Sequence, residues 1–300
     1  MRAAYDLGQG RWTPLPVFLA GAAIVNLTGP SLSWALLSPF FVGPFTGAVL
    51  AELGLLAIWT ALGAGRWTVR VPLTYFLAVL CLLLLAMGFN MGRMGPLQSG
   101  EVLHALALLP LVFLAAQLPL WIVRLIFGWR MVFAEGEEEP GAEVGQFGIA
   151  HLLGATALVA VSLGLAQLGS FEAGPLRSSD AAWLDMLAAC GVVALVSALG
   201  TIPCVWAVFL SRRPRLAVWA VGAYTFATSV VLVSLQAALT GISDFWAEAL
   251  TLALLTLGAL MATMLVGLGV VRFCGYEMFR PGSKPRNGKP LEGLRDWYEE

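Results

Sequence analysis

One acidic residue lies deep inside an apolar stretch of the chain: Glu52, which precedes Arg66 by 14 residues. On a helix this spacing spans about 21 Å, close to the middle of a bilayer core of about 30 Å. An ionisable side chain at that depth is a candidate for function. The alternative is a neutral glutamic acid that bonds to a neighbouring helix as a glutamine would. We favour this alternative, because the sequence shows no obvious counter-charge.

A second candidate is Glu101-x-x-His104, which has the spacing of one half of a carboxylate-bridged di-metal site. The other histidine of the chain, His151, is expected at the opposite membrane face, about 30 Å away. A shared metal is therefore not expected. The polarity of a helix start at the membrane interface explains both residues of the pair.

Three methionines, Met87, Met91 and Met94, have helical spacing and stand near His104 in the sequence. Thioethers can select Cu(I), but a methionine stripe is usually a packing surface. We expect no metal and no cofactor. The sequence contains no metalloprotease, serine-hydrolase or phosphate-loop motif.

The composition places the chain in a membrane. Of the 300 residues, 59% are hydrophobic and 12% are charged, and the mean hydropathy is +0.84. Soluble domains carry about a quarter charged residues. No basic patch is interleaved with aromatic residues, so nucleic acid is not an expected partner. The cysteines have neither disulfide nor zinc spacing and are interpreted as small buried side chains: Cys81, Cys190, Cys204 and Cys274.

The apolar runs predict an all-α, polytopic transmembrane bundle of about eight spans. We interpret the first run, which follows Arg2 and Arg11, as a retained span and not as a cleaved signal. With the N-terminus inside, only Arg93 and Arg177 of the 17 basic residues lie outside, which follows the positive-inside rule. Both termini are then expected in the cytoplasm of a bacterial inner membrane. The expected spans are 14–29, 37–63, 71–91, 102–127, 147–168, 183–210, 216–239 and 246–273.

The chain divides at an acidic, polar segment, 130–146, which is expected to be a cytoplasmic linker. It separates a first membrane half, 1–129, from a second, 147–274, and a tail, 275–300, is expected to be largely disordered. The end of the fourth span is echoed at the end of the eighth, 147 residues later. Four spans in each half would make the halves parallel repeats. The alternative is that cytoplasmic helix ends share arginine and aromatic residues by composition alone. The echoing pairs are Gly128 and Gly275, Trp129 and Tyr276, Met131 and Met278, Trp59 and Trp206, and Arg66 and Arg213.

Two short segments carry a resemblance. Gln-Phe-Gly-Ile-Ala-His-Leu-Leu-Gly-Ala-Thr-Ala-Leu-Val-Ala-Val (146–161) and Ala-Leu-Gly-Ala-Gly-Arg-Trp (61–67) resemble segments of uncharacterised bacterial multi-pass inner-membrane proteins. The resemblance covers a small part of the chain. It implies a membrane location and no particular activity.

Small residues predict where helices pack closely: Gly43-x-x-x-Gly47-x-x-x-Ala51 and Gly258-x-x-x-Ala262. The segment from Gly200 to Pro203 is expected to interrupt the sixth span. Because Pro203 has no amide hydrogen, the carbonyl of Leu199 loses its helical partner. We expect a neutral Glu52 to donate a hydrogen bond to this carbonyl across the two halves.

The leading functional hypothesis is a non-enzymatic membrane component, either permease-like or a scaffold. Its partners would be the lipid bilayer and another membrane protein or a second copy of the chain. A permease predicts that the polar residues Asn26, Glu52, Gln117 and Gln236 converge on a path, whereas a scaffold predicts that they pair off. The alternative is a small intramembrane enzyme or metal-handling protein with its site at the outer ends of the third and fourth spans.

Overall fold

The computed structural model describes residues 14–36, 39–63, 67–91, 99–133, 179–211, 213–240 and 246–279, and these are nearly all helical. The first part of the chain forms four helices: α1 (Pro14–Leu36), α2 (Pro39–Leu62), α3 (Trp67–Met91) and α4 (Ser99–Phe127). The second part forms α6 (Ser179–Val205), a π-helix (Trp206–Leu210), α7 (Pro214–Thr240) and α8 (Trp246–Phe273). Two short strands, β1 (Arg130–Phe133) and β2 (Tyr276–Phe279), complete the described elements.

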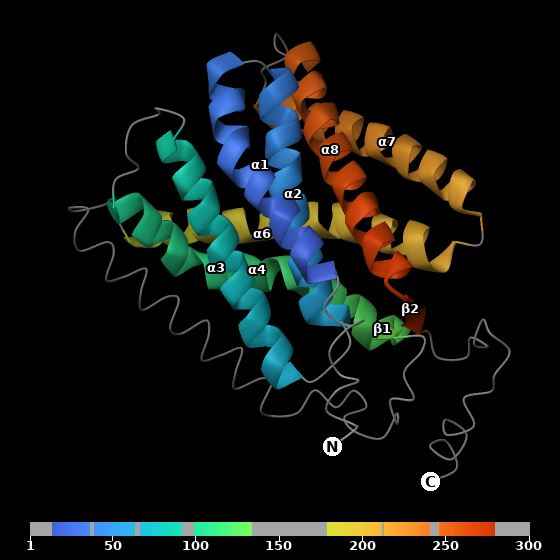
Figure 1. Ribbon diagram of the computed structural model, residues 1–300. Coiled ribbons are helices and arrows are strands. Elements are labelled where there is room, and N and C mark those ends of the chain that lie inside the picture. Colours follow the sequence, from blue (N-terminus) through green and yellow to red (C-terminus); the bar gives the residue numbers. More distant parts are fainter. Residues whose placement is uncertain are drawn as a thin grey trace, which may run out of the picture.

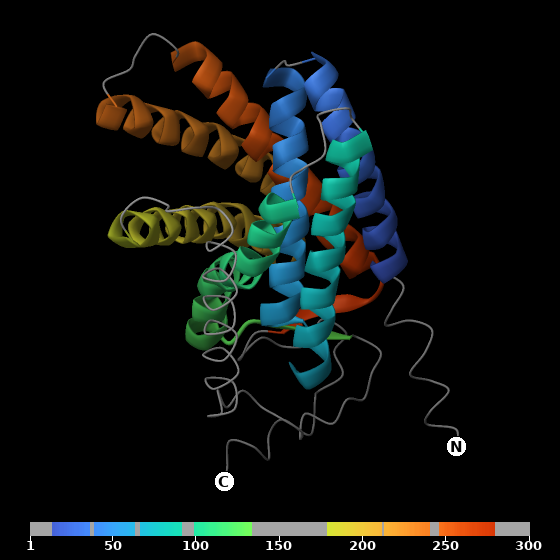
Figure 2. The ribbon, with the colours of Figure 1, turned by 90° about the vertical axis from the view of Figure 1, so that its left-hand side faces the viewer.

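Seven helices of the described chain are long and apolar enough to cross a membrane. The prediction of an all-α protein of the membrane type is confirmed at this level. The expected span 147–168 lies outside the described residues, as do most of the linker and the tail. Figure 1 shows that the helices do not form a parallel bundle, because α4 and α6 run across the upright helices α1, α2 and α3. Helix α6 lies across the direction of these helices in Figure 2 as well.

Helix α1 is longer than expected, because it continues through Gly29 and Pro30 to Leu36. The predicted end of the first span at Gly29 is therefore wrong. Pro30 has no amide hydrogen, so the carbonyl of Asn26, four residues back, has no helical donor. Close to the proline, the Thr28 hydroxyl donates to the Ile24 carbonyl at 2.6 Å. One missing backbone bond in a helix of 23 residues is tolerated when other groups satisfy the freed carbonyl.

Helices α2 and α8 lie side by side and run in the same direction (Figure 1). Gly43 contacts Leu255, and Gly47 contacts the backbone of Thr256 and Leu260. A Cβ atom on Gly47 would lie 2.2 Å from the Thr256 carbonyl oxygen. The Gly43-x-x-x-Gly47 face is thus a close-packing surface, as the sequence predicts.

The second small-residue face is not packed in this way. An added Cβ on Gly258 would meet nothing within 4 Å in the described part of the chain, and Ala262 is exposed. The described residues therefore form no tight contact at Gly258-x-x-x-Ala262. The packed face of α8 carries larger side chains, including Leu257, Leu260 and Met264.

The sixth span is not interrupted at the expected position. Helix α6 continues through Gly200 and Pro203 to Val205, and the irregularity follows as the π-helix Trp206–Leu210. A π-turn absorbs one extra residue without ending the helix. The expected break at Leu199, Gly200 and Pro203 is therefore corrected to a π-turn one turn later. Gly200 serves packing instead, because a Cβ there would lie 2.7 Å from Leu260 Cδ2.

Strands β1 and β2 form a two-stranded antiparallel sheet directly after α4 and α8 (Figure 1). Each is preceded by a glycine with positive φ, Gly128 at 64° and Gly275 at 88°. This left-handed conformation ends a helix and costs glycine little. The expected linker begins at 130 and the expected tail at 275, so the sheet occupies the start of both. The sequence analysis did not predict these strands.

Two of the cysteines, Cys81 and Cys204, are buried with free thiols, and Cys274 is half-buried and also free. These three agree with the prediction of packed side chains without disulfides. The side chain of Cys190 lies outside the described residues. The core around them joins both parts of the chain, and its largest fully buried side chains include Ile58, Leu62, Phe113, Leu120 and Met264.

Candidate functional site

The candidate site is a buried polar pair between α1 and α2. Asn26 Nδ2 donates a hydrogen bond of 2.7 Å to Glu52 Oε2. Asn26 is 1% exposed and Glu52 is 6% exposed. The remaining oxygens of the pair, Asn26 Oδ1 and Glu52 Oε1, are buried and have no hydrogen-bond partner among the described residues. Two acceptors left open in one contact are unusual in a bundle of this kind.

Helix α3 closes the site from the third side. Its Cys81 thiol lies beside Glu52, and Gly88 packs directly on the Asn26 backbone. A Cβ atom on Gly88 would lie 2.0 Å from the Asn26 carbonyl oxygen and 3.0 Å from Pro30 Cγ. Gly88 thus brings α3 against the carbonyl that Pro30 leaves without a helical donor. A Cα–H···O contact suits this geometry.

Glu52 does not bond to Leu199. Its partners in the described chain are Asn26 and the Cys81 thiol, and the expected bond across the two halves is wrong. Gly54, two residues later, is the position that faces the second part of the chain, where it contacts Thr201 and Met264. Two residues on a helix are separated by about 200°, so Glu52 faces away from α6.

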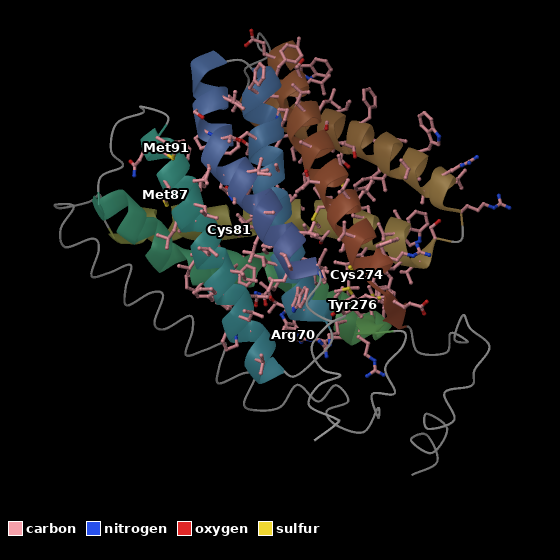
Figure 3. All side chains as sticks on the ribbon, in the orientation of Figure 1. Arg70, Cys81, Met87, Met91, Cys274 and Tyr276 are labelled. Carbon is pink, nitrogen blue, oxygen red and sulfur yellow. The ribbon has the colours of Figure 1, made fainter. Side chains whose placement is uncertain are left out.

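Two further polar contacts follow the seam between α2 and α3 toward the sheet. Thr60 Oγ1 donates to Thr74 Oγ1 at 2.9 Å, and both side chains are fully buried. Arg70 donates from Nη1 to the Gly63 carbonyl at the end of α2. Figure 3 shows Arg70 near the lower end of α3, well below Cys81. These contacts satisfy buried polar groups locally, as an apolar surrounding requires.

Two arginines make matching contacts at the helix ends beside the sheet. Arg124 Nη1 donates to the Ala61 carbonyl at 2.5 Å. Arg272 Nη1 donates to the Val208 carbonyl in the same way. The guanidinium of Arg124 also lies 5.4 Å from the centre of the Trp121 ring, a cation–π distance. The sequence predicted only that these arginines lie on the cytoplasmic side, and their bonds to the last turns of other helices were not predicted.

The other polar candidates lie on α4 and α7. Gln117 is buried in α4, where its Oε1 accepts a hydrogen bond of 3.4 Å from Trp121 Nε1. Gln236 is exposed on α7. Of the four path candidates, Asn26 and Glu52 bond to each other.

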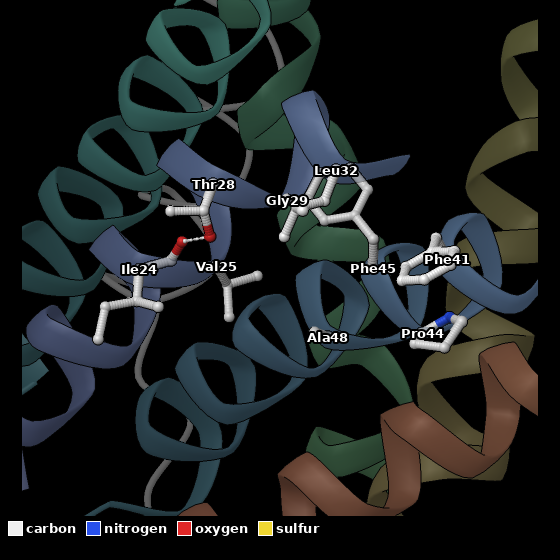
Figure 4. A pocket seen from close by; sticks show the side chains of 9 residues that line it. All are labelled: Ile24, Val25, Thr28, Gly29, Leu32, Phe41, Pro44, Phe45 and Ala48. Atoms are coloured by element: carbon white, nitrogen blue, oxygen red, sulfur yellow. Dashed lines mark hydrogen bonds between the residues drawn. The ribbon is translucent and has the colours of Figure 1, made fainter. Parts of the chain in front are cut away.

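Cavities near the site are apolar. A hollow of about 250 Å³ lies between α1 and α2 (Figure 4). Its walls include Val25, next to Asn26, and Ala48, one turn before Glu52. A second cavity of about 20 Å³ lies between α2, α4, α6 and α8, lined by residues that include Leu53, Ser197 and Thr201. That volume suits a single water molecule and no larger solute.

The metal candidates are only partly described. Met87 and Met91 point outward on α3, 54% and 70% exposed (Figure 3). Met94 lies outside the described residues, and the side chains of Glu101 and His104 are not described either. Among the described residues there is no group of three His, Cys, Asp or Glu side chains that could hold a metal ion.

Comparison with known proteins found no match: no protein-family model, no curated protein and no solved structure is similar to this chain. The functional argument therefore rests on the geometry described above.

Proposed function

We propose that the chain is a non-enzymatic integral membrane scaffold, whose intramembrane polar side chains hold its helices together and do not line a transport path. The observation that carries this proposal is that Glu52 bonds to Asn26, whereas Gln117 bonds to Trp121 and Gln236 is exposed on α7. Its surroundings are the lipid bilayer of a bacterial inner membrane. Its partner is a second membrane protein or another copy of the chain.

We further propose that the scaffold consists of two equivalent four-span halves. Ala61 and Val208 are 147 residues apart, and each receives a hydrogen bond from an arginine at the end of another helix, Arg124 and Arg272. The two helices that carry these arginines each continue through a left-handed glycine into a strand of the same sheet. The two arginines are 148 residues apart, so one inserted residue separates them from the offset of their acceptors. A contact that recurs on equivalent acceptors is explained by duplication more simply than by shared composition.

The same contacts support eight spans. They gather the C-terminal ends of α2, α4, α6 and α8 at the sheet. Because α6 also ends there, the chain must return to the opposite end between β1 and α6. This supports the expected span at 147–168. The arginines at this end support a cytoplasmic position for it and for both termini.

A permease-like role is the second candidate, and one observation favours it. The cavity of about 20 Å³ is lined by three pairs of residues 147 positions apart: Leu50 and Ser197, Leu53 and Gly200, and Gly54 and Thr201. It therefore lies where the two halves meet. Transporters with parallel repeats often bind substrate at such an interface. The cavity is closed and small, however, so the scaffold remains the first proposal.

The distance between the two halves distinguishes these candidates without knowledge of a substrate. Spin labels at Met91 of α3 and Leu235 of α7, both exposed, report the separation of the ends away from the sheet. The scaffold predicts one narrow distance distribution in lipid vesicles, unchanged with pH. Two populations of distance would instead support the permease. A pair within the first half, Met91 and Val42, serves as the control and stays fixed in both cases.

A further inference from the structure

The Asn26–Glu52 pair contains two buried acceptor oxygens that lack a hydrogen-bond donor in the described chain. A carboxyl group and an amide are both planar and can face each other edge to edge. One edge is already joined by the bond from Asn26 Nδ2 to Glu52 Oε2. The remaining oxygens are Glu52 Oε1 and Asn26 Oδ1, and neither has a hydrogen-bond partner in the described chain. Exchanging the amide nitrogen and oxygen of Asn26 does not help, because one acceptor would still face a carboxyl oxygen.

We propose that Glu52 and Asn26 form a binding site for one proton. The proton is bonded to Glu52 Oε1 and donated to Asn26 Oδ1, which closes a carboxylic acid–amide ring. One proton thereby satisfies both open acceptors. A carboxylate would leave them facing each other and would bury a negative charge in an apolar surrounding.

No cation on the described helices competes with this proton. Arg124 bonds to Ala61, nine residues and about 14 Å along α2 from Glu52. Arg70 bonds to Gly63, which is farther still. The titratable group that faces Glu52 from α3 is the Cys81 thiol, and α1 contributes the uncharged Asn26. Helices α6 and α8 pack on the other side of α2, through Thr201 and Met264.

A metal ion does not fit the site. The pair offers two free oxygens, whereas Ca²⁺ takes six to eight oxygen ligands and Mg²⁺ requires an octahedral set. A proton needs only the space between two oxygens in hydrogen-bond contact.

The bound proton also fixes the position of α1. Beside the site, α1 is weakened by Pro30 and packs on Gly88 of α3. On the other side, the apolar hollow of Figure 4 separates α1 from α2 within one turn of the pair. The acid–amide ring is thus the polar contact that joins α1 to α2 at this depth. Loss of the proton would loosen α1 and open the hollow further.

Infrared spectroscopy of the full chain in lipid vesicles tests the proposal. With ¹³C-labelled glutamate, the wild type should show the C=O band of a protonated glutamic acid at neutral pH, displaced by the label and by H–D exchange. The band should disappear in Glu52→Gln. In Asn26→Leu it should move to higher frequency, because its proton loses the acceptor. The labelled wild type gives an answer even if a variant does not fold.

Thr60→Val is the matched control, since it removes a buried polar contact of α2, here with α3, that cannot titrate. It should leave the carboxyl band unchanged. Thermal unfolding should separate the variants in the same way. Glu52→Gln should keep the melting temperature, because a glutamine amide closes the same ring, whereas Asn26→Leu should lower it. A wild type with only carboxylate bands, or a band that Asn26→Leu does not move, overturns the proposal.

Discussion

Met131 of β1 lies opposite Met278 of β2, and these two residues are 147 positions apart in the chain. Under the 147-residue offset, Met278 is the residue equivalent to Met131. When equivalent residues lie opposite each other in an antiparallel pair, a two-fold axis between them exchanges the two strands. The neighbours agree, because Arg130 pairs with Phe279 and Val132 pairs with Glu277. These two flanking pairs are the ones that a two-fold axis between the proposed halves would exchange.

The arginine contacts beside the sheet should stabilise both halves. Arg124→Met and Arg272→Met each remove the donor to a helix-end carbonyl, Ala61 or Val208. We expect each variant to lose about 1–3 kcal/mol of unfolding free energy, because a partly buried acceptor is left open. Thermal unfolding in detergent measures this. Arg213→Met is the control, since Arg213 is exposed, and it should change stability by less than about 0.5 kcal/mol. Equal stability of all three variants would contradict the capping role.

The contact of α2 with α8 should not tolerate a side chain at Gly47. Gly47→Ala places a Cβ atom 2.2 Å from the Thr256 carbonyl oxygen, so the helices must separate. Overpacking of this kind costs about 1–3 kcal/mol. Gly258→Ala is the matched substitution on α8, where the new Cβ meets nothing within 4 Å in the described chain. It should be neutral, or stabilising by up to about 1 kcal/mol from helix propensity. A Gly47→Ala protein as stable as Gly258→Ala would argue against the close contact.

The two halves should assemble from separate chains. Cutting between Glu135 and Glu143 leaves β1 attached to the first half and β2 to the second. The contacts of α2 with α8 and of α4 with α6 then hold the fragments together, the latter including Ser197 Oγ to the Ala116 carbonyl at 2.8 Å. Co-expressed fragments should co-purify, whereas each alone should be degraded because its interface is exposed. Degradation of co-expressed fragments would show that the segment joins a single unit.

The helices could largely be predicted from the sequence, because apolar length is a strong signal in a membrane protein. The eighth span was expected at 246–273 and is found at Trp246–Phe273. The helix ends near prolines were less predictable. Pro30 and Pro203 both lie inside helices, although each proline leaves one carbonyl without its helical donor.

The partner of Glu52 could not be predicted, because depth in the membrane does not determine which way a side chain points around its helix. The internal repeat led to Leu199, and the structure places Asn26 there instead. The two-stranded sheet could not be predicted from the sequence either. Strands of four residues carry little pattern, and their pairing depends on two helices ending at the same place. The repeated glycine at positions 128 and 275 was the one sequence feature that pointed to the sheet.

The central claim is that eight spans form two halves of the same orientation, and the sidedness of the segment between β1 and α6 tests it most directly. Single cysteines at Gly136 and Ser178, in a background without the native four, are treated in intact cells with an impermeant thiol reagent. Cysteines at Gly95 and Ser283 are the references for the outer and inner side. The account predicts labelling at Ser178 and Gly95 and protection at Gly136 and Ser283. Labelling of Gly136 from outside, or the same result at Gly136 and Ser178, would contradict it.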